Sequence, residues 1–353
     1  MNRTFRTTNI GLIFLAGLLL LACQATPSPP VEVTRVVEVT RVVTVEAPTP
    51  EPIVIQPEVA LPSDFRSWFH LGSKAIRPEG ATALGLPADI FGNTFDAVYA
   101  NSVALEDLRS GTRPFRDGAV FVAPFYALES PAEGVDTSGE LLFTAVMEKN
   151  AQWYAETAGW GFEAFNPQGE RLVDLRPACV ACHQRQADND LVFSTLKERA
   201  VDAVPADDNG VYLPPNYRTM FHVGSKAIMP EGAATLGLPP DIFGNTFDAV
   251  YVNRIALDAL RNDVRPFPEG SLLVADFHTL DTSVDGVRAY GDQAFTAVML
   301  KKAAGKGDDQ ITGDWGFAAF DAAGKPLTEL RSACIGCHAS QKANDYVFTT
   351  LKQ

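Results

Sequence analysis

The chain has 353 residues and a formal net charge of −14 at pH 7. Hydrophobic residues make up 46% and charged residues 20%, so the chain can bury a core and is long enough for two domains of ordinary size. Its 43 acidic against 29 basic residues argue against a nucleic-acid binder, which needs positive charge opposite the phosphates. We expect instead a partner protein with a basic docking face.

Residues 1–22 have the features of a bacterial lipoprotein signal peptide. Arg3 and Arg6 form a short basic region, and the apolar run at 11–21 is too short to span a bilayer as a mature helix. The run is followed by Ala22 and Cys23, a pattern that resembles a lipobox. The alternative is a signal peptide cleaved elsewhere, with an incidental cysteine. We expect an exported protein that is anchored by lipid on Cys23 to the bacterial cell membrane and faces away from the cytoplasm.

Residues 23–60 form a low-complexity segment rich in Pro, Val, Thr and Glu. The six residues at 32–37 recur at 38–43, and no aromatic residue is present. A packed core is therefore not expected here, and the composition predicts a disordered or extended stalk. A local hairpin formed by the two Val-rich repeats is the alternative.

The rest of the chain consists of two tandem copies of one sequence unit. Residues 69–101 and 221–253 are identical at 27 of 33 positions, with an offset of 152. The offset becomes 155 from Trp160 and Trp315 onward. We predict one domain at 61–200 (repeat one), an acidic, turn-rich linker at 201–211 and a second domain at 212–353 (repeat two).

Within a unit, the sequence favours short strands in an antiparallel sheet with a few short helices, an α+β fold class. The strands expected in repeat one are 95–99, 119–128, 141–147 and 160–165. Helices are expected to end at Arg109, after a cap at Asn101 or Ser102, and at Arg261, after a cap at Asn253.

Each unit ends in a Cys-x-x-Cys-His motif on a predicted short helix. The motif residues are Cys179, Cys182 and His183 in repeat one, and Cys334, Cys337 and His338 in repeat two. Two thiols one helical turn apart can add to the vinyl groups of a haem, and the adjacent histidine can then bind the iron. The sequence therefore predicts two c-type haems, one per repeat.

The cysteines allow three other interpretations. One zinc could be held by all four thiolates, but both motif histidines would then have no role. Redox disulfides are a second interpretation, although no thioredoxin-like alternation of strands and helices surrounds the motifs. Unmodified thiols are the third, and an oxidising compartment disfavours them.

The sixth iron ligand is left open by the sequence. His70 and His222 recur at matched positions and are candidate distal ligands, as are Met147 and Met299. An open or water-occupied position is the third alternative. Among the other recurring residues, we expect packing near the haem edge from Trp160, Phe162, Trp315 and Phe317. We expect Lys74 and Lys226 to be solvated.

The duplicated motifs resemble the cytochrome P-460 family. In repeat one they are Arg-Ser-Trp-Phe-His at 66–70, Phe-Asp-Ala-Val-Tyr-Ala-Asn at 95–101, Pro-Phe-Arg-Asp-Gly at 114–118, Gly-Trp-Gly-Phe at 159–162 and Asn-Asp-Leu-Val-Phe at 189–193. The resemblance implies a mainly antiparallel β domain with flanking helices, a c-type haem and a proximal histidine. It also implies homodimer-like packing, so the two repeats are expected to form a pseudo-twofold pair within one chain.

The resemblance breaks down at the positions that the family's hydroxylamine-oxidising enzymes use. Their cross-linked lysine aligns with Ala123 and Ala275, their carboxylate with Thr144 and Thr296, and their arginine with Asp96 and Asp248. The chain is in this respect similar to cytochrome c-prime-beta, whose members lack the cross-link and bind small gases at an apolar distal face.

Two functions follow as competing expectations. The first is a membrane-tethered dihaem cytochrome that transfers electrons and has an open, uncharged distal site for a ligand such as nitric oxide, with no catalytic residue assigned. The alternative is an oxidoreductase acting on nitrogen oxides such as hydroxylamine or nitric oxide.

Overall fold

The computed structural model describes residues 58–197, 206–308 and 312–351, all within one compact unit that begins at Ile55. The predicted signal peptide, Cys23 and nearly all of the stalk lie outside the described residues, as does the first part of the linker. In the described ranges, no helix has the length and apolar character needed to cross a bilayer.

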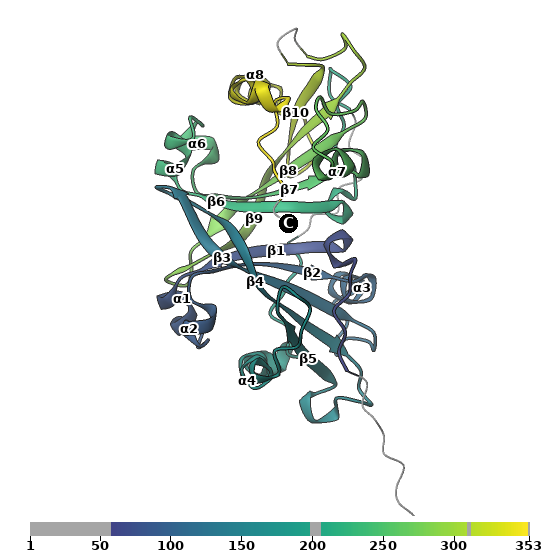
Figure 1. The fold of residues 1–353 in the computed structure, drawn as a ribbon, viewed down its shortest axis with the longest axis vertical. Helices are drawn as coiled ribbons and strands as arrows, with labels where there is room; N and C mark the ends of the chain where they lie inside the picture. Colours follow the sequence, from purple (N-terminus) through teal and green to yellow (C-terminus); the bar gives the residue numbers. More distant parts are fainter. Residues whose placement is uncertain (1–57, 198–205, 309–311, 352–353) are drawn as a thin grey trace, which may run out of the picture. The chain divides into compact units, whose positions relative to one another are not determined.

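Both repeats contain the same series of elements (Figure 1). Repeat one contains β1 (Phe69–Ile76), α1 (Pro78–Ala83), α2 (Ala88–Phe91), β2 (Thr94–Ala100), α3 (Ser102–Ser110), β3 (Val120–Ala132), β4 (Val135–Lys149), β5 (Trp160–Phe165) and α4 (Arg176–His183). Repeat two contains β6 (Phe221–Ile228), α5 (Pro230–Thr235), α6 (Pro240–Phe243), β7 (Thr246–Val252), α7 (Arg254–Arg261), β8 (Leu272–Asp281), β9 (Val287–Lys301), β10 (Trp315–Asp321) and α8 (Arg331–His338).

Local sequence signals account for the helix boundaries. The Asn101 side chain accepts a hydrogen bond from the Ala104 amide at 2.9 Å, and Asn253 does the same for Ala256 at 3.0 Å. Gly111 ends α3 in the left-handed region, at φ 69°. The two predicted caps are therefore confirmed, as is the helical placement of both cysteine motifs.

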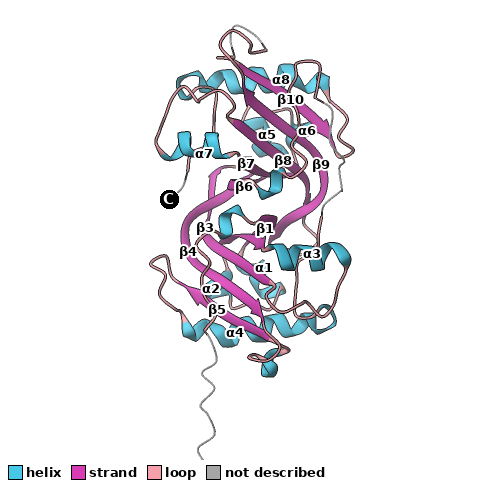
Figure 2. Cartoon of the chain, turned by 90° about the vertical axis from the view of Figure 1, so that its right-hand side faces the viewer, coloured by secondary structure: helices cyan, strands magenta, loops and turns pink. Residues whose placement is uncertain are grey.

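The two repeats share a single sheet. Every strand pair is antiparallel, and the order is β1-β2-β3-β4-β6-β7-β8-β9-β10, with β5 paired to β4. An additional β1–β9 pairing closes the sheet on itself. Figure 2 shows β4 and β9 curving from one repeat toward the other. The antiparallel, β-rich expectation is confirmed, but the sequence did not predict that the two copies share one sheet.

The two junctions between repeats have the same register. Val135 pairs with Ile228 where β4 meets β6, and Val287 pairs with Ile76 where β9 meets β1. Strand β4 therefore begins at residue 135, well before the predicted 141, since its first residues pair with the other repeat. The polar residues at 136–138 hid this extension, because they interrupt the apolar alternation that marks a half-buried strand.

The hairpin tips make close backbone contacts across the junctions. The Gly286 carbonyl accepts from the Arg77 amide, and the Gly134 carbonyl from the Met229 amide, both at 2.8 Å. A Cβ at Gly80 would collide with the Gly286 backbone, and one at Gly232 with the Gly134 backbone. Both positions therefore require glycine.

We expect Gly80→Ala and Gly232→Ala each to lower the free energy of unfolding by about 1–3 kcal/mol, because backbone must move to admit the methyl group. Gly224→Ala is the matched control, since no atom lies within 4 Å of a Cβ at that position. Urea unfolding followed by circular dichroism measures the difference. Equal stability of all three variants would contradict the close packing of the tips.

Candidate functional site

The motif histidine of repeat one is held in one orientation. His183 ends α4, and its Nδ1 donates to the Leu191 carbonyl at 2.7 Å. A carbonyl can only accept, so Nδ1 carries the proton and the Nε2 lone pair is left free for a metal. His338 makes the equivalent bond to the Tyr346 carbonyl at 2.6 Å. This arrangement fits an axial iron ligand next to two thiols.

A buried ion pair supports the loop that provides this carbonyl. Asp190 and Leu191 both have left-handed backbone, with φ of 52° and 64°. Lys149 Nζ contacts both Asp190 carboxylate oxygens at 2.8 Å, and the Phe115 amide donates to the same carboxylate at 2.7 Å. Lys301 and Asp345 repeat the pair in repeat two. Asp190 and Leu191 belong to the motif at 189–193, but the pairing of Asp190 with Lys149 was not predicted, although both residues recur in repeat two.

Aromatic rings flank each motif histidine. Ring centroids of Phe162 and Phe193 lie 5.1 and 5.2 Å from that of His183. Phe193 is 45% exposed and its counterpart Phe348 is 48% exposed, which is unusual for large apolar side chains that pack against a partly buried histidine. Trp160 instead lies fully buried in the core against Phe115.

A cavity of about 380 Å³ opens beside α4, and Cys179, Cys182 and His183 lie in its wall. Most of the remaining wall is apolar, and half of its residues come from β1 to β5. Ala123, Ala145 and Met147 line it, whereas Thr144, the residue aligned with the family's carboxylate, does not. The size lies within the range of cofactor and ligand sites.

The cavity wall contains charged residues, whereas an uncharged site was expected. Lys74 lines it and forms an ion pair with Asp96, Nζ to Oδ2 3.1 Å, on a carboxylate that is 3% exposed. Burial raises the pKa of Asp96, and Lys74 opposes that shift. Lys226 and Asp248 form the same pair at 3.2 Å in repeat two. Lys74 and Lys226 therefore have a defined partner and are not simply solvated.

A second carboxylate in the wall is specific to repeat one. Glu163 is 1% exposed and accepts from Arg171 at 2.8 Å and from Arg176 at 2.6 Å. The counterpart of Glu163 in repeat two is Ala318. The two repeats therefore surround their cysteine motifs with different charges.

His70 and His222, the candidate distal ligands, do not line this cavity. Both are buried between the repeats, where their rings stack with centroids 3.9 Å apart and planes 10° apart. A hydrogen-bonded chain crosses the contact in the order Tyr251, His70, Ser73, Ser225, His222 and Tyr99, with distances of 2.8, 3.1, 3.3, 2.9 and 2.7 Å. Each ring nitrogen of His70 and His222 therefore has a hydrogen-bond partner, and the two histidines join the repeats.

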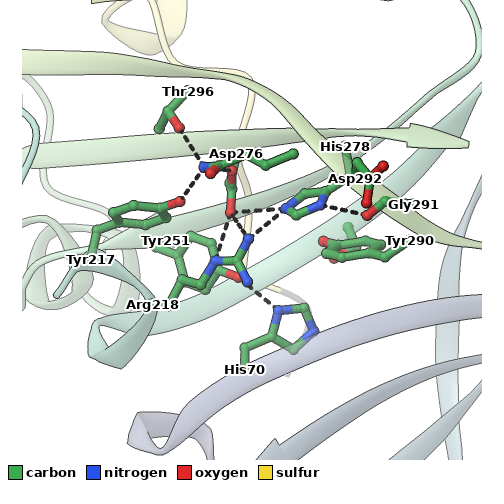
Figure 3. Close-up of polar contacts among 12 residues, drawn as sticks. His70, Tyr217, Arg218, Tyr251, Asp276, His278, Tyr290, Gly291, Asp292 and Thr296 are labelled. Atoms are coloured by element: carbon green, nitrogen blue, oxygen red, sulfur yellow. Dashed lines mark hydrogen bonds and ion pairs between the residues drawn. The ribbon is translucent and has the colours of Figure 1, made fainter. Parts of the chain in front are cut away.

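A polar network of repeat-two residues lies next to this series of hydrogen bonds (Figure 3). Arg218 donates to Asp276 at 2.8 Å and to His278 Nε2 at 2.5 Å, and His278 Nδ1 donates to the Gly291 carbonyl at 3.1 Å. Burial opposes ionisation of Asp276, but Arg218 and His278 together hold its pKa below the usual range. In repeat one, Pro124 and Tyr126 stand at the positions of Asp276 and His278.

The protonation of the motif thiols argues against a reactive dithiol. Burial and the neighbouring Cys182 raise the pKa of Cys179 to about 11, and burial and Cys337 do the same for Cys334. Reactive dithiols have lowered values. Within the described ranges, no group of three or more His, Cys, Asp or Glu side chains is placed to hold a metal ion, which weighs against a zinc site made by the four cysteines.

Comparison with known families supports the resemblance stated from the motifs. The sequence model of the family described as Cytochrome P460 matches residues 62–194 and 214–349, so one match falls on each repeat and the two cover more than half of the chain. A search of curated proteins gave no significant match.

The stacked histidines should make stability depend on pH. Burial and then His222 hold the pKa of His70 well below 6.5, and burial and then Arg66 lower that of His222 to about 3. Tyr99, Tyr251, Tyr290, Arg66, Arg218 and His278 also surround the pair. Below pH 6.5 the unfolded chain therefore takes up protons that the folded chain does not, and stability is lost as the pH falls toward 3.

Between the two pKa values, each histidine should lower the free energy of unfolding by up to about 1.4 kcal/mol for each unit by which the pH falls. Urea unfolding at a series of pH values measures it. The double variant His70→Gln, His222→Gln should show a flatter dependence in the same window, since the carboxylates titrate equally in both proteins. An unchanged slope would contradict the assignment of neutral histidines to this contact.

Proposed function

This chain belongs to the cytochrome P460 family, and on that premise we propose that it is a dihaem c-type cytochrome with an open ligand position. Membership of the family implies a c-type haem. We assign one haem to Cys179, Cys182 and His183, and a second to Cys334, Cys337 and His338. The observation that carries the assignment is the Nδ1–H bond of each motif histidine to a backbone carbonyl, which leaves Nε2 free.

The chain's own residues would hold and orient the group. The two thiols of each motif would form the covalent links to the haem. The ion pairs Lys149–Asp190 and Lys301–Asp345 support the loops whose carbonyls orient the motif histidines. Phe162 and Phe193 would exclude water from the histidine side in repeat one. A bound c-type haem supplies one-electron redox chemistry and an iron that can bind diatomic gases.

The cavity would give a haem iron in repeat one room for a second ligand. His70 is engaged by Tyr251 and Ser73 and lies outside the cavity, so it is not offered as that ligand. Met147 lines the cavity but packs with Phe121 and Phe162 in an apolar cluster, so it is assigned to the wall. The mostly apolar wall suits a neutral diatomic ligand such as nitric oxide. Electron transfer to a protein with a basic docking face accords with the charge of −14.

A catalytic nitrogen-oxide oxidoreductase is the second candidate, and Asp96 is the observation that favours it. The carboxylate lies in the cavity wall with its pKa raised by burial, so it is placed to exchange a proton with a bound ligand. Ala123 lines the same cavity where the family's enzymes have their cross-linked lysine, and this favours the non-catalytic assignment.

We further propose that lipid on Cys23 tethers the protein to the bacterial membrane, outside the cytoplasm. Cys23→Ser should move the protein from the membrane fraction to the soluble fraction. Both haems should remain attached, because the substitution is remote from the two motifs. Persistence in the membrane fraction would contradict the tether.

The number of haems is tested by intact mass and a haem assay of the mature protein. We expect two haems in the unsubstituted chain, one in Cys182→Ala and close to none stably attached in Cys182→Ala, Cys337→Ala. Zinc in place of haem would overturn the proposal.

The ligand position is tested by the visible spectrum before and after addition of nitric oxide. We expect a high-spin component that shifts on binding, because neither candidate histidine lines the cavity of repeat one, Lys74 is paired with Asp96 and Met147 packs in the apolar wall. His70→Ala, His222→Ala should leave the spin state unchanged. A low-spin spectrum that becomes high-spin in this double variant would show that the histidines bind the iron.

A further inference from the structure

The cavity of repeat one is not built from repeat one alone. Five of its lining residues come from the β8–β9 hairpin of repeat two: Asp281, Ser283, Val284, Val287 and Ala289. They share this wall with Lys74 and Ile76 of β1. The hairpin therefore completes the site that contains Cys179, Cys182 and His183.

Strand pairing fixes the base of this hairpin. Lys74, Ala75 and Ile76 of β1 pair with Ala289, Arg288 and Val287 of β9. Lys74 and Ile76 line the cavity on one strand, and Val287 and Ala289 line it on the other. The two strands thus present adjacent parts of a single wall.

Backbone and charge contacts hold the tip. Gly286 accepts from the Arg77 amide and packs against Gly80, so the tip lies against the beginning of α1. Arg288 forms an ion pair with the buried Asp136, which Arg77 also contacts at 2.9 Å. A wall held in this way can control access to the cavity, unlike an exposed loop that moves freely.

We propose that Val284, at the tip of the repeat-two hairpin, controls the entry of small ligands to the iron of repeat one. This inference rests on the proposed haem function. The two sites would be completed reciprocally, because the repeat-one hairpin makes the equivalent contacts: β4 pairs with β6, and Gly134 accepts from Met229 and packs against Gly232.

The duplication has left the two tips different. Ala132 occupies the position of Val284, and Pro131 that of Ser283. The repeat-one site is therefore bordered by a valine, and the equivalent position near the repeat-two site carries an alanine, which is smaller by two methyl groups. We expect slower ligand entry at the repeat-one iron for this reason.

The test measures carbon monoxide association with the ferrous protein by flash photolysis, in full-length chains that keep one haem. Cys334→Ala, Cys337→Ala keeps the haem of repeat one, and Cys179→Ala, Cys182→Ala keeps that of repeat two. Val284→Ala should accelerate association severalfold at the repeat-one haem and leave the repeat-two haem unchanged. Ala132→Val is the reciprocal variant and should slow the repeat-two haem alone.

Val284→Phe adds volume at the same place. It should slow carbon monoxide association at the repeat-one haem, the opposite of the effect expected for Val284→Ala. Unchanged rates at the repeat-one haem in both Val284 variants would overturn the inference, as would an effect confined to the repeat-two haem. In those cases haem remains attached and the proposed function stands. Absence of attached haem from every form would overturn both.

Discussion

The pairing of strands between the two repeats is the constraint on which the rest of the structure depends. Neither repeat closes its sheet by itself: β1 needs β9, and β4 needs β6. The closed sheet buries Phe95, Phe247 and the stacked pair His70 and His222 at the contact. Buried polar side chains are tolerated there because each one has a hydrogen-bond partner across or beside the junction.

The proposed haem sites depend on this closure through the hairpins. Each hairpin must reach the other repeat to complete its strand ladder, and in doing so the repeat-two hairpin becomes part of the repeat-one cavity. The helix that carries the cysteines is placed separately, by β5 and by the loop anchored through Lys149 and Asp190. A substitution at the contact between the repeats would therefore alter the cavity wall formed by the hairpin more directly than it would alter the helix that carries the cysteines.

A duplicated chain can hold an asymmetric contact that two identical subunits could not. Asp136 and Arg288 occupy equivalent positions and meet each other across the junction. Two copies of repeat one would place two aspartates there, and two copies of repeat two would place two arginines. The unlike pair therefore favours pairing of repeat one with repeat two. The Arg218, Asp276 and His278 network, with no charged counterpart at positions 124 and 126, is a second divergence of this kind.

The sequence by itself determined the elements and the chemistry that are local. The spacing of Cys179, Cys182 and His183 specifies a helical turn that ends in a histidine, and the asparagine caps specify where α3 and α7 begin, because these signals act within a few residues. The duplication was visible for the same reason, as a direct match of residues. The tertiary structure decided what depends on which strands meet. It placed His70 against His222, Lys74 beside Asp96 and Val284 in the cavity of the other repeat. A one-residue shift in strand register exchanges the two faces of a strand, and partners on different strands leave no local pattern in the sequence, so only the folded sheet could assign these contacts.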